Sequence, residues 1–238
     1  MFGDSGLAVY ALGVPWLVHA YTASSAVMAF LAIRAVVQGD ARTAFLWLAA
    51  TVIVDATDGA LARAAGVRQR LPRFDGARLD DIVDYLTFVF VPLALIEREG
   101  LLPDAAALPV VGAALLASAY GFSREDAKTP DHFFTGFPSY WNIVALYLVA
   151  IGAGPWVNAL ILASLTALVF VPIGYVYPSR TPTLRRTTIG FGTLWGAAVL
   201  AMIWQLPSPS PALVYGSLAF PAYYTALSLW LQSLRGRS

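Results

Sequence analysis

An all-α integral membrane protein is the fold class that this sequence predicts, and two observations predict it. Of the 238 residues, 58% are hydrophobic and only 12% are charged, and the mean hydropathy is +0.67. A soluble domain carries about 25% charged residues, so this composition excludes an ordinary soluble globule, a disordered chain and a nucleic-acid-binding module. Apolar stretches long enough to cross a membrane also recur along the whole chain.

A transmembrane helix needs roughly 20 mostly apolar residues. Such stretches lie between turn signals at residues 14–36, 43–63, 79–98, 104–123, 139–153, 156–177, 187–205 and 212–233. They predict a polytopic bundle of about eight transmembrane helices. The fifth stretch is short, and the Gly152, Gly154 and Pro155 that follow it leave a kinked or re-entrant segment open as an alternative.

The distribution of basic residues favours an orientation with both termini in the cytoplasm. With that orientation, twelve of the fifteen Lys and Arg lie on the cytoplasmic side, and only Arg34, Arg42 and Arg98 lie outside. This asymmetry is the positive-inside pattern. Because no repeat or linker divides the sequence, we expect a single membrane-embedded domain over residues 1–238, with a core at about 14–205.

The residue types that could bind a metal are almost restricted to carboxylates. The chain has no Cys and two His. Thiolate sites and Cys nucleophiles are therefore excluded, and a zinc site built on imidazoles would be hard to assemble. A metal would be held mainly by Asp and Glu, whose oxygens suit Mg²⁺ or Mn²⁺.

Residues 55–92 are the most informative part of the sequence. Asp55 and Asp58 lie near the end of the second predicted span, and Asp80 and Asp84 lie at the start of the third. At about 100° per residue, the first two fall within about 60° of each other, and the last two also share a helical face. Two consecutive helices can therefore direct four carboxylates at one point.

Four converging carboxylates at the edge of a membrane imply a divalent ion. Isolated carboxylates there cost several kcal/mol each, and mutual repulsion protonates some of them unless a cation lies among them. Gly59, Ala62 and Gly76 agree with this interpretation, since small side chains leave room for a ligand against the backbone. The alternative is that the small residues only allow close helix packing, with the acids as caps at the interface.

These residues carry a family resemblance. The pattern Asp55, Asp58, Gly59, Ala62, Arg63, Gly76, Asp80 and Asp84 resembles the signature D-x-x-D-G-x-x-A-R…G-x-x-x-D-x-x-x-D of the CDP-alcohol phosphotransferases. The likeness runs from about His19 to Tyr147, well over half of the chain.

One feature departs from the common family form. The linker between Arg63 and Gly76 is longer. This linker and the later HFFTGFPSYWNIVALYL look like the bacterial branch of the family that uses choline as acceptor. We expect residues 64–75 to form a basic amphipathic segment on the membrane surface.

The resemblance implies a reaction, cofactors and partners. The reaction would be transfer of the phosphatidyl group from CDP-diacylglycerol to the choline hydroxyl, with release of CMP. Two divalent ions, Mn²⁺ or Mg²⁺, would be held by Asp55, Asp58 and Asp80, and Asp84 would be both the catalytic base and a ligand of the second ion. The resemblance also implies contact with membrane lipids, a homodimer, and a multi-pass location in the bacterial inner membrane with the active site on the cytoplasmic side.

Several residues are candidates for binding CDP-diacylglycerol. Arg63 could hold the nucleotide phosphate and other arginines the lipid phosphate, although membrane topology and attraction to anionic lipids explain such arginines equally well. The first span contributes a hydroxyl that could contact the nucleotide or bond back to its own helix. The full set is Thr22, Gly59, Ala62, Arg63, Gly76, Arg124 and Arg180.

The acceptor is predicted from aromatic residues. The quaternary ammonium of choline needs aromatic faces and nearby negative charge. The DHFFTGFPSYWN loop supplies Phe133, Phe134, Tyr140 and Trp141, for which an aromatic belt at the membrane interface is the alternative explanation. Two other functions remain open: the same chemistry with serine, glycerol phosphate or inositol, and a cation- or proton-coupled transporter, which would spread its acids along the membrane depth.

Overall fold

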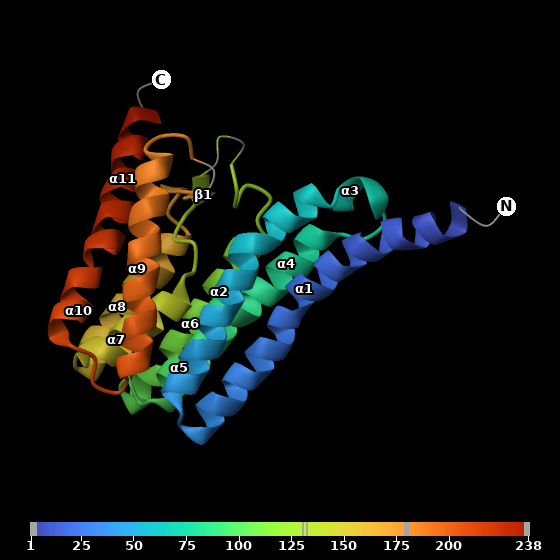
Figure 1. Ribbon diagram of the computed structural model, residues 1–238. Coiled ribbons are helices and arrows are strands. Elements are labelled where there is room, and N and C mark those ends of the chain that lie inside the picture. The colour runs from blue at the N-terminus through green and yellow to red at the C-terminus, as the bar shows by residue number, and fades with distance from the viewer. Residues whose placement is uncertain (1–3, 130, 132, 179–180, 236–238) are drawn as a thin grey trace.

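The computed structural model describes residues 4–129, 131, 133–178 and 181–235, with side chains placed from residue 13 onward (Figure 1). Its helices are α1 (Asp4–Gln38), α2 (Ala41–Ala64), α3 (Val67–Arg70), α4 (Gly76–Asp84), the π-helix η1 (Tyr85–Phe90), α5 (Val91–Arg98), α6 (Asp104–Ser123), α7 (Trp141–Ile151), α8 (Pro155–Val169), α9 (Arg185–Gln205), α10 (Pro211–Ser217) and α11 (Ala219–Arg235). Two short strands, β1 (Phe133–Thr135) and β2 (Gly174–Val176), form a small antiparallel sheet.

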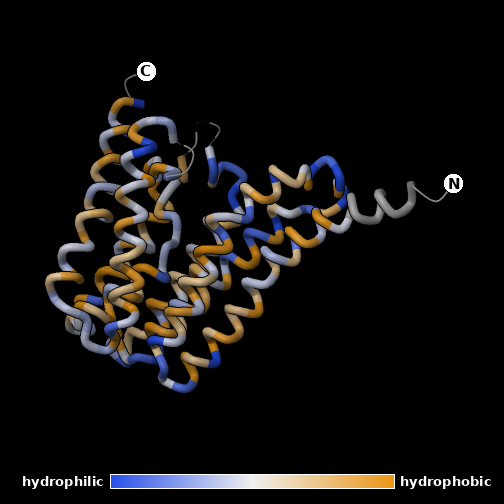
Figure 2. The backbone as a smooth tube through the Cα atoms, viewed as in Figure 1, coloured by the Kyte–Doolittle hydropathy of each residue, from blue (hydrophilic) through white to orange (hydrophobic). Residues whose placement is uncertain are grey.

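The chain is an all-α membrane protein, as the sequence predicts. By length and composition, four helices could cross a membrane: Gly13–Gln38, Ala41–Ala64, Asp104–Ser123 and Arg185–Gln205. Figure 2 shows apolar residues along the helices and hydrophilic residues concentrated in the connections at their ends. The other four predicted stretches are also helical but shorter or divided, at α4–η1–α5, α7, α8 and α10–α11. Eight crossings therefore stay a prediction.

The predicted span over residues 156–177 is wrong at its end. Helix α8 stops at Val169, and Gly174–Val176 forms strand β2, which pairs with β1 through Phe134 opposite Tyr175. Pro172 lies between the two elements and explains the change, since it has no N–H for a helix and disfavours helical backbone in the residue before it. The sequence prediction mistook an apolar strand for the continuation of a helix.

The break after the fifth predicted span is a true helix end. Gly152 has φ +63° and caps α7, and Pro155 occupies the first turn of α8. Glycine takes this left-handed conformation readily, and proline is suited to a first turn because its missing N–H has no partner there. Residues 139–153 thus give a helix of 11 residues, Trp141–Ile151, which is separate from α8.

Two aspartates fix the starts of the helices that carry the acids. The Asp40 carboxylate accepts a hydrogen bond from the Thr43 backbone N–H at 3.0 Å and begins α2. The Asp75 carboxylate accepts bonds from the Ala77 and Arg78 N–H groups, both at 3.2 Å, and begins α4. Such N-caps satisfy donors that the helix itself leaves unpaired, and each stabilises a helix by about 1 kcal/mol.

Helix α4 continues into α5 through the π-helical segment η1. Pro92 at the start of α5 has no N–H to donate to the preceding turn, so the regular hydrogen-bond ladder is interrupted there. The wider π turn begins at Tyr85, directly after Asp84. π-helical segments often lie at functional sites, and this one starts where the acidic face of α4 ends.

The helices pack so that the acids lie above the main apolar core. Helix α1 runs along α2 and contacts α4, while α5 packs on α7 and α6 packs on α8 (Figure 1). Fully buried core side chains include Leu48, Leu93, Ile96 and Trp141. A smaller apolar cluster around Phe133 and Leu231 joins the sheet to α11.

Candidate active site

Carboxylates from α2 and α4 meet at one end of the bundle. One oxygen each from Asp55, Asp80 and Asp84 can be chosen so that all three lie within 4.8 Å of one another. Asp80 and Asp84 are one turn apart on α4, and Asp55 faces them from α2. The helical periodicity predicted this meeting of two consecutive helices, and the structure confirms it for these three acids.

Asp58 lies next to this group and is held by the first helix. Its side chain is 7% exposed, and its Oδ2 accepts a hydrogen bond from the Thr22 hydroxyl at 2.8 Å. The same hydroxyl lies 3.4 Å from the Val18 carbonyl, a much longer contact. Thr22 therefore orients a carboxylate from α2. The sequence had predicted either a contact to the nucleotide or a bond back to its own helix, and not this role.

The acids lie close enough to repel one another. Asp55 and Asp58 interact electrostatically, and Asp80 interacts with both of them. Asp80 Oδ1 is buried and has no hydrogen-bond partner in the described part of the chain. Buried polar atoms nearly always have a partner, so an unpaired carboxylate oxygen among other carboxylates leaves this region short of positive charge.

The small residues of the motif are closely approached by side chains. A Cβ added to Gly76 would lie 2.7 Å from His19 Cε1, so the imidazole occupies the space that a larger residue would need. A Cβ on Gly59 would lie 3.3 Å from Arg63 Nη1, which places the guanidinium against the backbone of α2. Ala62 is partly buried on the same helix. At Gly76 the space beside the backbone is filled by this chain itself.

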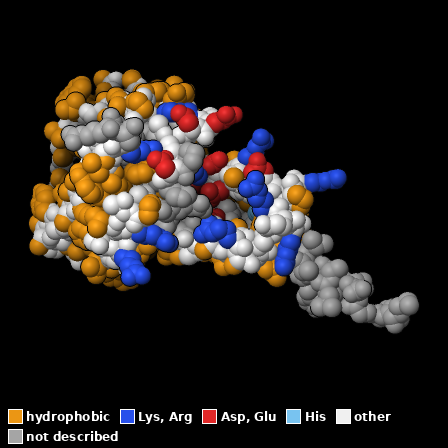
Figure 3. All heavy atoms as spheres, turned by 90° about the horizontal axis from the view of Figure 1, so that it is seen from above, with side chains coloured by type: hydrophobic (Ala, Val, Ile, Leu, Met, Phe, Trp, Pro, Cys, Tyr) orange, Lys and Arg blue, Asp and Glu red, His pale blue; other side chains and the backbone are white. Residues whose placement is uncertain are grey.

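The linker over residues 64–75 is exposed and basic. It contains the short helix α3, whose Val67 is buried while Arg68 and Arg70 are exposed. The Phe74 ring packs against the His19 ring in a tilted arrangement, with centroids 4.3 Å apart, and so connects the linker to α1. Figure 3 looks onto this end of the molecule, where acidic side chains gather at a hollow and basic side chains lie around it.

Of the two arginine candidates beyond the motif, the structure describes only Arg124. Arg124 forms a two-pronged pair with Asp126, with N···O distances of 2.7 and 2.6 Å, and this hydrogen bonding holds the pKa of Asp126 below its usual value. Its guanidinium also lies over the Tyr120 ring. Arg180 lies outside the described residues.

The aromatic candidates occupy different environments. Trp141 is 0% exposed, and its indole N–H donates to the Ser118 hydroxyl at 2.8 Å, so it packs α7 against α6 within the core. Phe133 is buried in the small cluster, and its ring already faces the Arg235 guanidinium at 4.3 Å. The Phe134 ring packs against the Tyr177 ring in a tilted arrangement, with centroids 4.7 Å apart. These residues do not form one cage.

Tyr140 is the aromatic candidate beside the acids. Its side chain interacts electrostatically with Asp55 and Asp84, and its hydroxyl lies beside that of Tyr224. The Tyr224 hydroxyl in turn donates to the Val176 carbonyl of β2 at 3.0 Å. Tyr224 was not predicted at this site, because the sheet whose Val176 carbonyl it contacts was not predicted either.

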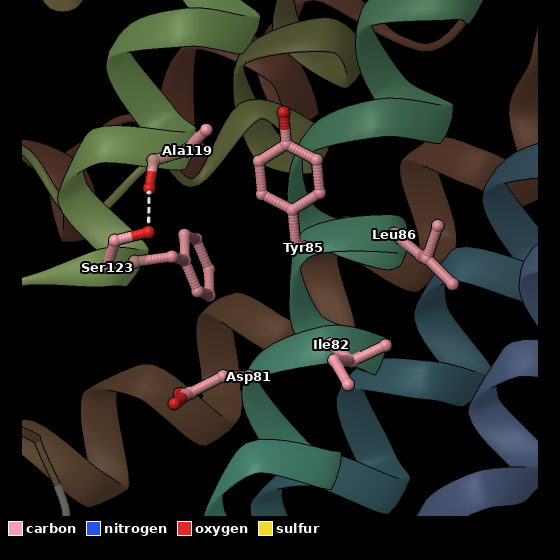
Figure 4. Close-up of a pocket in the computed structure, with 7 residues that line it drawn as sticks. Asp81, Ile82, Tyr85, Leu86, Ala119 and Ser123 are labelled. Carbon is pink, nitrogen blue, oxygen red and sulfur yellow. Dashed lines mark hydrogen bonds between the residues drawn. The ribbon is translucent and has the colours of Figure 1, made fainter.

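Asp81 lies on a different face of α4 from its neighbour Asp80. It borders a groove of about 360 Å³ between α4–η1 and α6, together with Tyr85 and Ser123 (Figure 4). The Lys128 ammonium, from the loop after α6, lies 3.6 Å from Asp81 Oδ1. Sequence reasoning treated Lys128 only as one of the cytoplasmic basic residues, although it is the single lysine in the chain.

Fold and site together define a helical membrane protein in which two successive helices bring acidic residues together at one end. No family model matches the chain. It is 38% identical over 222 residues to a phosphatidylcholine synthase from Legionella pneumophila, covering 90% of this chain and 87% of the relative. The corresponding enzyme from Pseudomonas aeruginosa is 37% identical, with 90% of each chain covered. One from Rhizobium meliloti is 31% identical, covering 90% of this chain and 89% of the relative. The chain belongs to the phosphatidylcholine synthase family.

Proposed function

We propose that this chain transfers the phosphatidyl group of CDP-diacylglycerol to the hydroxyl of choline and releases CMP, in a reaction that depends on divalent cations. Family membership supports the substrates. The observation that carries the proposed site is the meeting of Asp55, Asp80 and Asp84 with all three ligand atoms within 4.8 Å.

The residues present fit a divalent ion. Carboxylate oxygens are the donors that Mg²⁺ and Mn²⁺ prefer, and the unpaired Asp80 Oδ1 offers one without breaking an existing hydrogen bond. Asp55, Asp58, Asp80 and Asp84 would hold two ions, with Thr22 fixing the orientation of Asp58. When bound, such ions would offset part of the charge of the diphosphate and stabilise the charge that develops on the departing nucleotide.

Asp84 acts as the base in this proposal. The choline oxygen forms a bond to the phosphorus that carries diacylglycerol, the phosphoanhydride bond to CMP breaks, and the hydroxyl proton passes to the Asp84 carboxylate. General bases of this kind contribute about 10²- to 10⁴-fold in rate. Asp84 lies at the end of α4, one turn from Asp80 and next to the π-helical turn, so a base at this position would lie beside the proposed metal ligands.

The contacts to the two substrates are also proposals. Arg63, held against Gly59, is the best supported contact for the nucleotide phosphate, because it lies within two turns of Asp58 on the same helix. Tyr140 is the best supported contact for the choline ammonium, because it combines an aromatic face with the nearby charges of Asp55 and Asp84. Trp141 is not included, since it has no exposed surface.

We also propose a topology of eight crossings with both termini and the acidic end in the cytoplasm of the bacterium, within its inner membrane. The exposed basic linker at the acidic end supports this orientation through the positive-inside rule. Single-cysteine variants provide the test, since the chain has no cysteine of its own. A cysteine in place of Arg68 should react with an impermeant maleimide only after the membrane is opened, whereas one in place of Glu99 should react in intact spheroplasts.

A single domain over residues 1–238 with a core at about 14–205 remains a proposal, supported by an apolar core that extends from Ala29 to Val214. A homodimer is likewise proposed on the family resemblance alone. Multi-angle light scattering of the purified protein in detergent tests it, with twice the mass of one chain as the expected result.

An acceptor panel tests the proposed function. Purified protein with Mn²⁺ or Mg²⁺ and CDP-diacylglycerol is offered choline, serine, glycerol phosphate or inositol, and CMP release is measured with the lipid product. We expect CMP and phosphatidylcholine with choline. CMP release only with another alcohol would mean that the proposed phosphatidyl transfer is right but that choline is not the acceptor. No CMP release with any of the four alcohols would overturn the proposal. A transporter would also give none, but the gathering of the acids at one end of two helices does not favour that function.

A further inference from the structure

Lysine is used once in this chain. Of the fifteen basic residues, fourteen are arginines and one is Lys128. A lysine ammonium is a compact point charge with three donors, whereas the arginine guanidinium is a planar fork that suits fixed two-pronged pairs. Arg124 forms such a pair with Asp126, and Arg235 lies close to Asp131. The single lysine lies instead 3.6 Å from Asp81, the residue next to Asp80 of the candidate active site.

The backbone around Lys128 is fixed by the small sheet. Lys128 forms an isolated bridge with Phe134, and the Thr135 N–H donates to the Ala127 carbonyl at 3.0 Å. On the other side, the Thr129 N–H donates to the Phe133 carbonyl at 2.8 Å. The Cα of Lys128 is therefore held beside β1.

The ammonium of Lys128 is attracted to the acids without being tied to one of them. It lies 3.6 Å from Asp81 Oδ1, which is longer than a charge-assisted hydrogen bond, and its side chain is 52% exposed. Partial burial lowers its pKa, but the charges of Asp81 and Asp80 outweigh this, so that the pKa lies above its usual value. The side chain is thus a charged, half-exposed donor at the edge of the carboxylate group.

We propose that Lys128 binds the diphosphate of the nucleotide-activated lipid in the active site. This inference rests on the proposed function and extends it to a residue outside the family motif. Ions held among four carboxylates are largely matched by the charge of their own ligands, so an incoming diphosphate still needs a cation from the protein. Lys128 lies 3.6 Å from Asp81 and interacts electrostatically with Asp80 and Asp84, and an ammonium is a common phosphate ligand.

The uniqueness of Lys128 allows a test that does not depend on turnover. The purified protein, carrying a lysine-free affinity tag, is treated with a water-soluble acetylating ester in Mn²⁺, and acetylation of Lys128 is followed by peptide mass spectrometry. CDP-diacylglycerol without choline should slow this acetylation about tenfold, as expected for an amine held by phosphate. Choline alone should have no effect. Unchanged acetylation at a donor concentration that saturates turnover would overturn the inference.

A second lysine provides the control for the labelling. Arg98 lies at the exposed end of α5, far along the helix from Asp84, so an Arg98→Lys variant adds a reference amine away from the site. Its acetylation should proceed at the same rate with and without donor. If the donor slowed both amines equally, the protection would come from the lipid–detergent mixture and the inference would fail.

Substitutions separate phosphate binding from a structural ion pair. Lys128→Met should raise the KM for CDP-diacylglycerol about tenfold and leave the KM for choline unchanged, with Lys128→Arg recovering part of the loss. Asp81→Asn removes the ion-pair partner and should leave the donor KM unchanged. Equal effects of Lys128→Met and Asp81→Asn would contradict the inference.

The proposed function and this inference fail in different ways. If the wild-type protein makes phosphatidylcholine but the donor does not protect Lys128, only the inference is wrong. If the wild-type protein releases no CMP with any acceptor, the proposed function is wrong whatever the labelling shows.

Discussion

Two groups of polar side chains lie within the bundle, and they differ in whether their hydrogen-bonding atoms have partners. In the core between α7, α9 and α10, the Tyr147 and Ser217 hydroxyls are 2.7 Å apart, and the Trp195 indole N–H donates to the Tyr147 oxygen at 3.0 Å. Nearby in sequence, the Trp141 indole N–H reaches Ser118. Each donor finds an acceptor inside the protein, as buried polar groups generally do.

In the acidic group at the other end, not every hydrogen-bonding atom has a partner in the described part of the chain. Thr22 donates to Asp58, but Asp80 Oδ1 has no partner among the described residues, and Asp55, Asp80 and Asp84 approach one another closely. Such an arrangement costs several kcal/mol unless cations are supplied. The first group joins core helices to one another, whereas the second leaves negative charge uncompensated by the described residues, as expected if it binds cations.

The largest expected effect comes from removing a carboxylate of the second group. Asp80→Asn should lower turnover by a factor on the order of 10³ or more, because ion binding and the charge stabilisation that it provides are lost together. CMP release under saturating substrates is the measurement, with circular dichroism to check that the helices remain. Asp104→Asn, an exposed acid in the first turn of α6, is the matched control and should be fully active. Activity of Asp80→Asn close to that of the wild type would remove the basis for the comparison.

The core group should respond in stability rather than in catalysis. Trp141→Ala should lower the free energy of unfolding by about 3–5 kcal/mol, because it opens a cavity and leaves Ser118 unpaired. Thermal unfolding in detergent measures this loss. Trp141→Phe should be milder and should keep the wild-type KM for choline. A large rise in that KM with unchanged stability would instead place Trp141 at the substrate.

The link between α1 and the acids predicts an intermediate effect. Thr22→Val keeps the side-chain shape and removes the bond to Asp58, and hydrogen bonds to charged groups are worth about 1.5–3 kcal/mol. The Mn²⁺ concentration that gives half-maximal activity should therefore rise about tenfold or more. Thr51→Val is the control, since that buried hydroxyl bonds only to the Leu48 carbonyl in its own helix. The same shift in both variants would mean that Thr22 has no special role in orienting Asp58.

The smallest of these effects concerns the acceptor. Tyr140→Ala should raise the KM for choline about tenfold and change the KM for CDP-diacylglycerol much less, because cation–π contacts contribute about 1–2 kcal/mol. Tyr140→Phe keeps the ring and should stay near the wild-type value. Equal changes in the two KM values would assign Tyr140 to packing.

Helical periodicity is local, and it correctly predicted that acids of α2 and α4 meet, whereas their role as a metal site stays a prediction. Spacings of three and four residues place Asp55 beside Asp58 and Asp80 beside Asp84 on their helices, which are joined by the linker that contains α3. These quantities follow from neighbouring residues alone, so no knowledge of distant contacts was needed.

The sequence was less informative where distant segments meet. Residues 174–176 are as apolar as a helix end, and only their pairing with 133–135 makes them a strand. Trp141 belongs to an aromatic-rich loop in the sequence, yet its burial depends on Ser118 of α6. Lys128 lies near Asp81 because the same sheet holds its loop in place. The sequence alone shows that Lys128 is the one lysine of the chain, but it does not show this contact.

Binding of Mn²⁺ to the purified protein, followed by electron paramagnetic resonance in the absence of substrates, tests the central idea most directly. The wild-type chain should bind Mn²⁺ and quench the signal of the free ion, Asp104→Asn should do the same, and Asp80→Asn should lose most of this binding. Equal affinity for Mn²⁺ in the wild type and in Asp80→Asn would show that the acids of α2 and α4 are not the metal site.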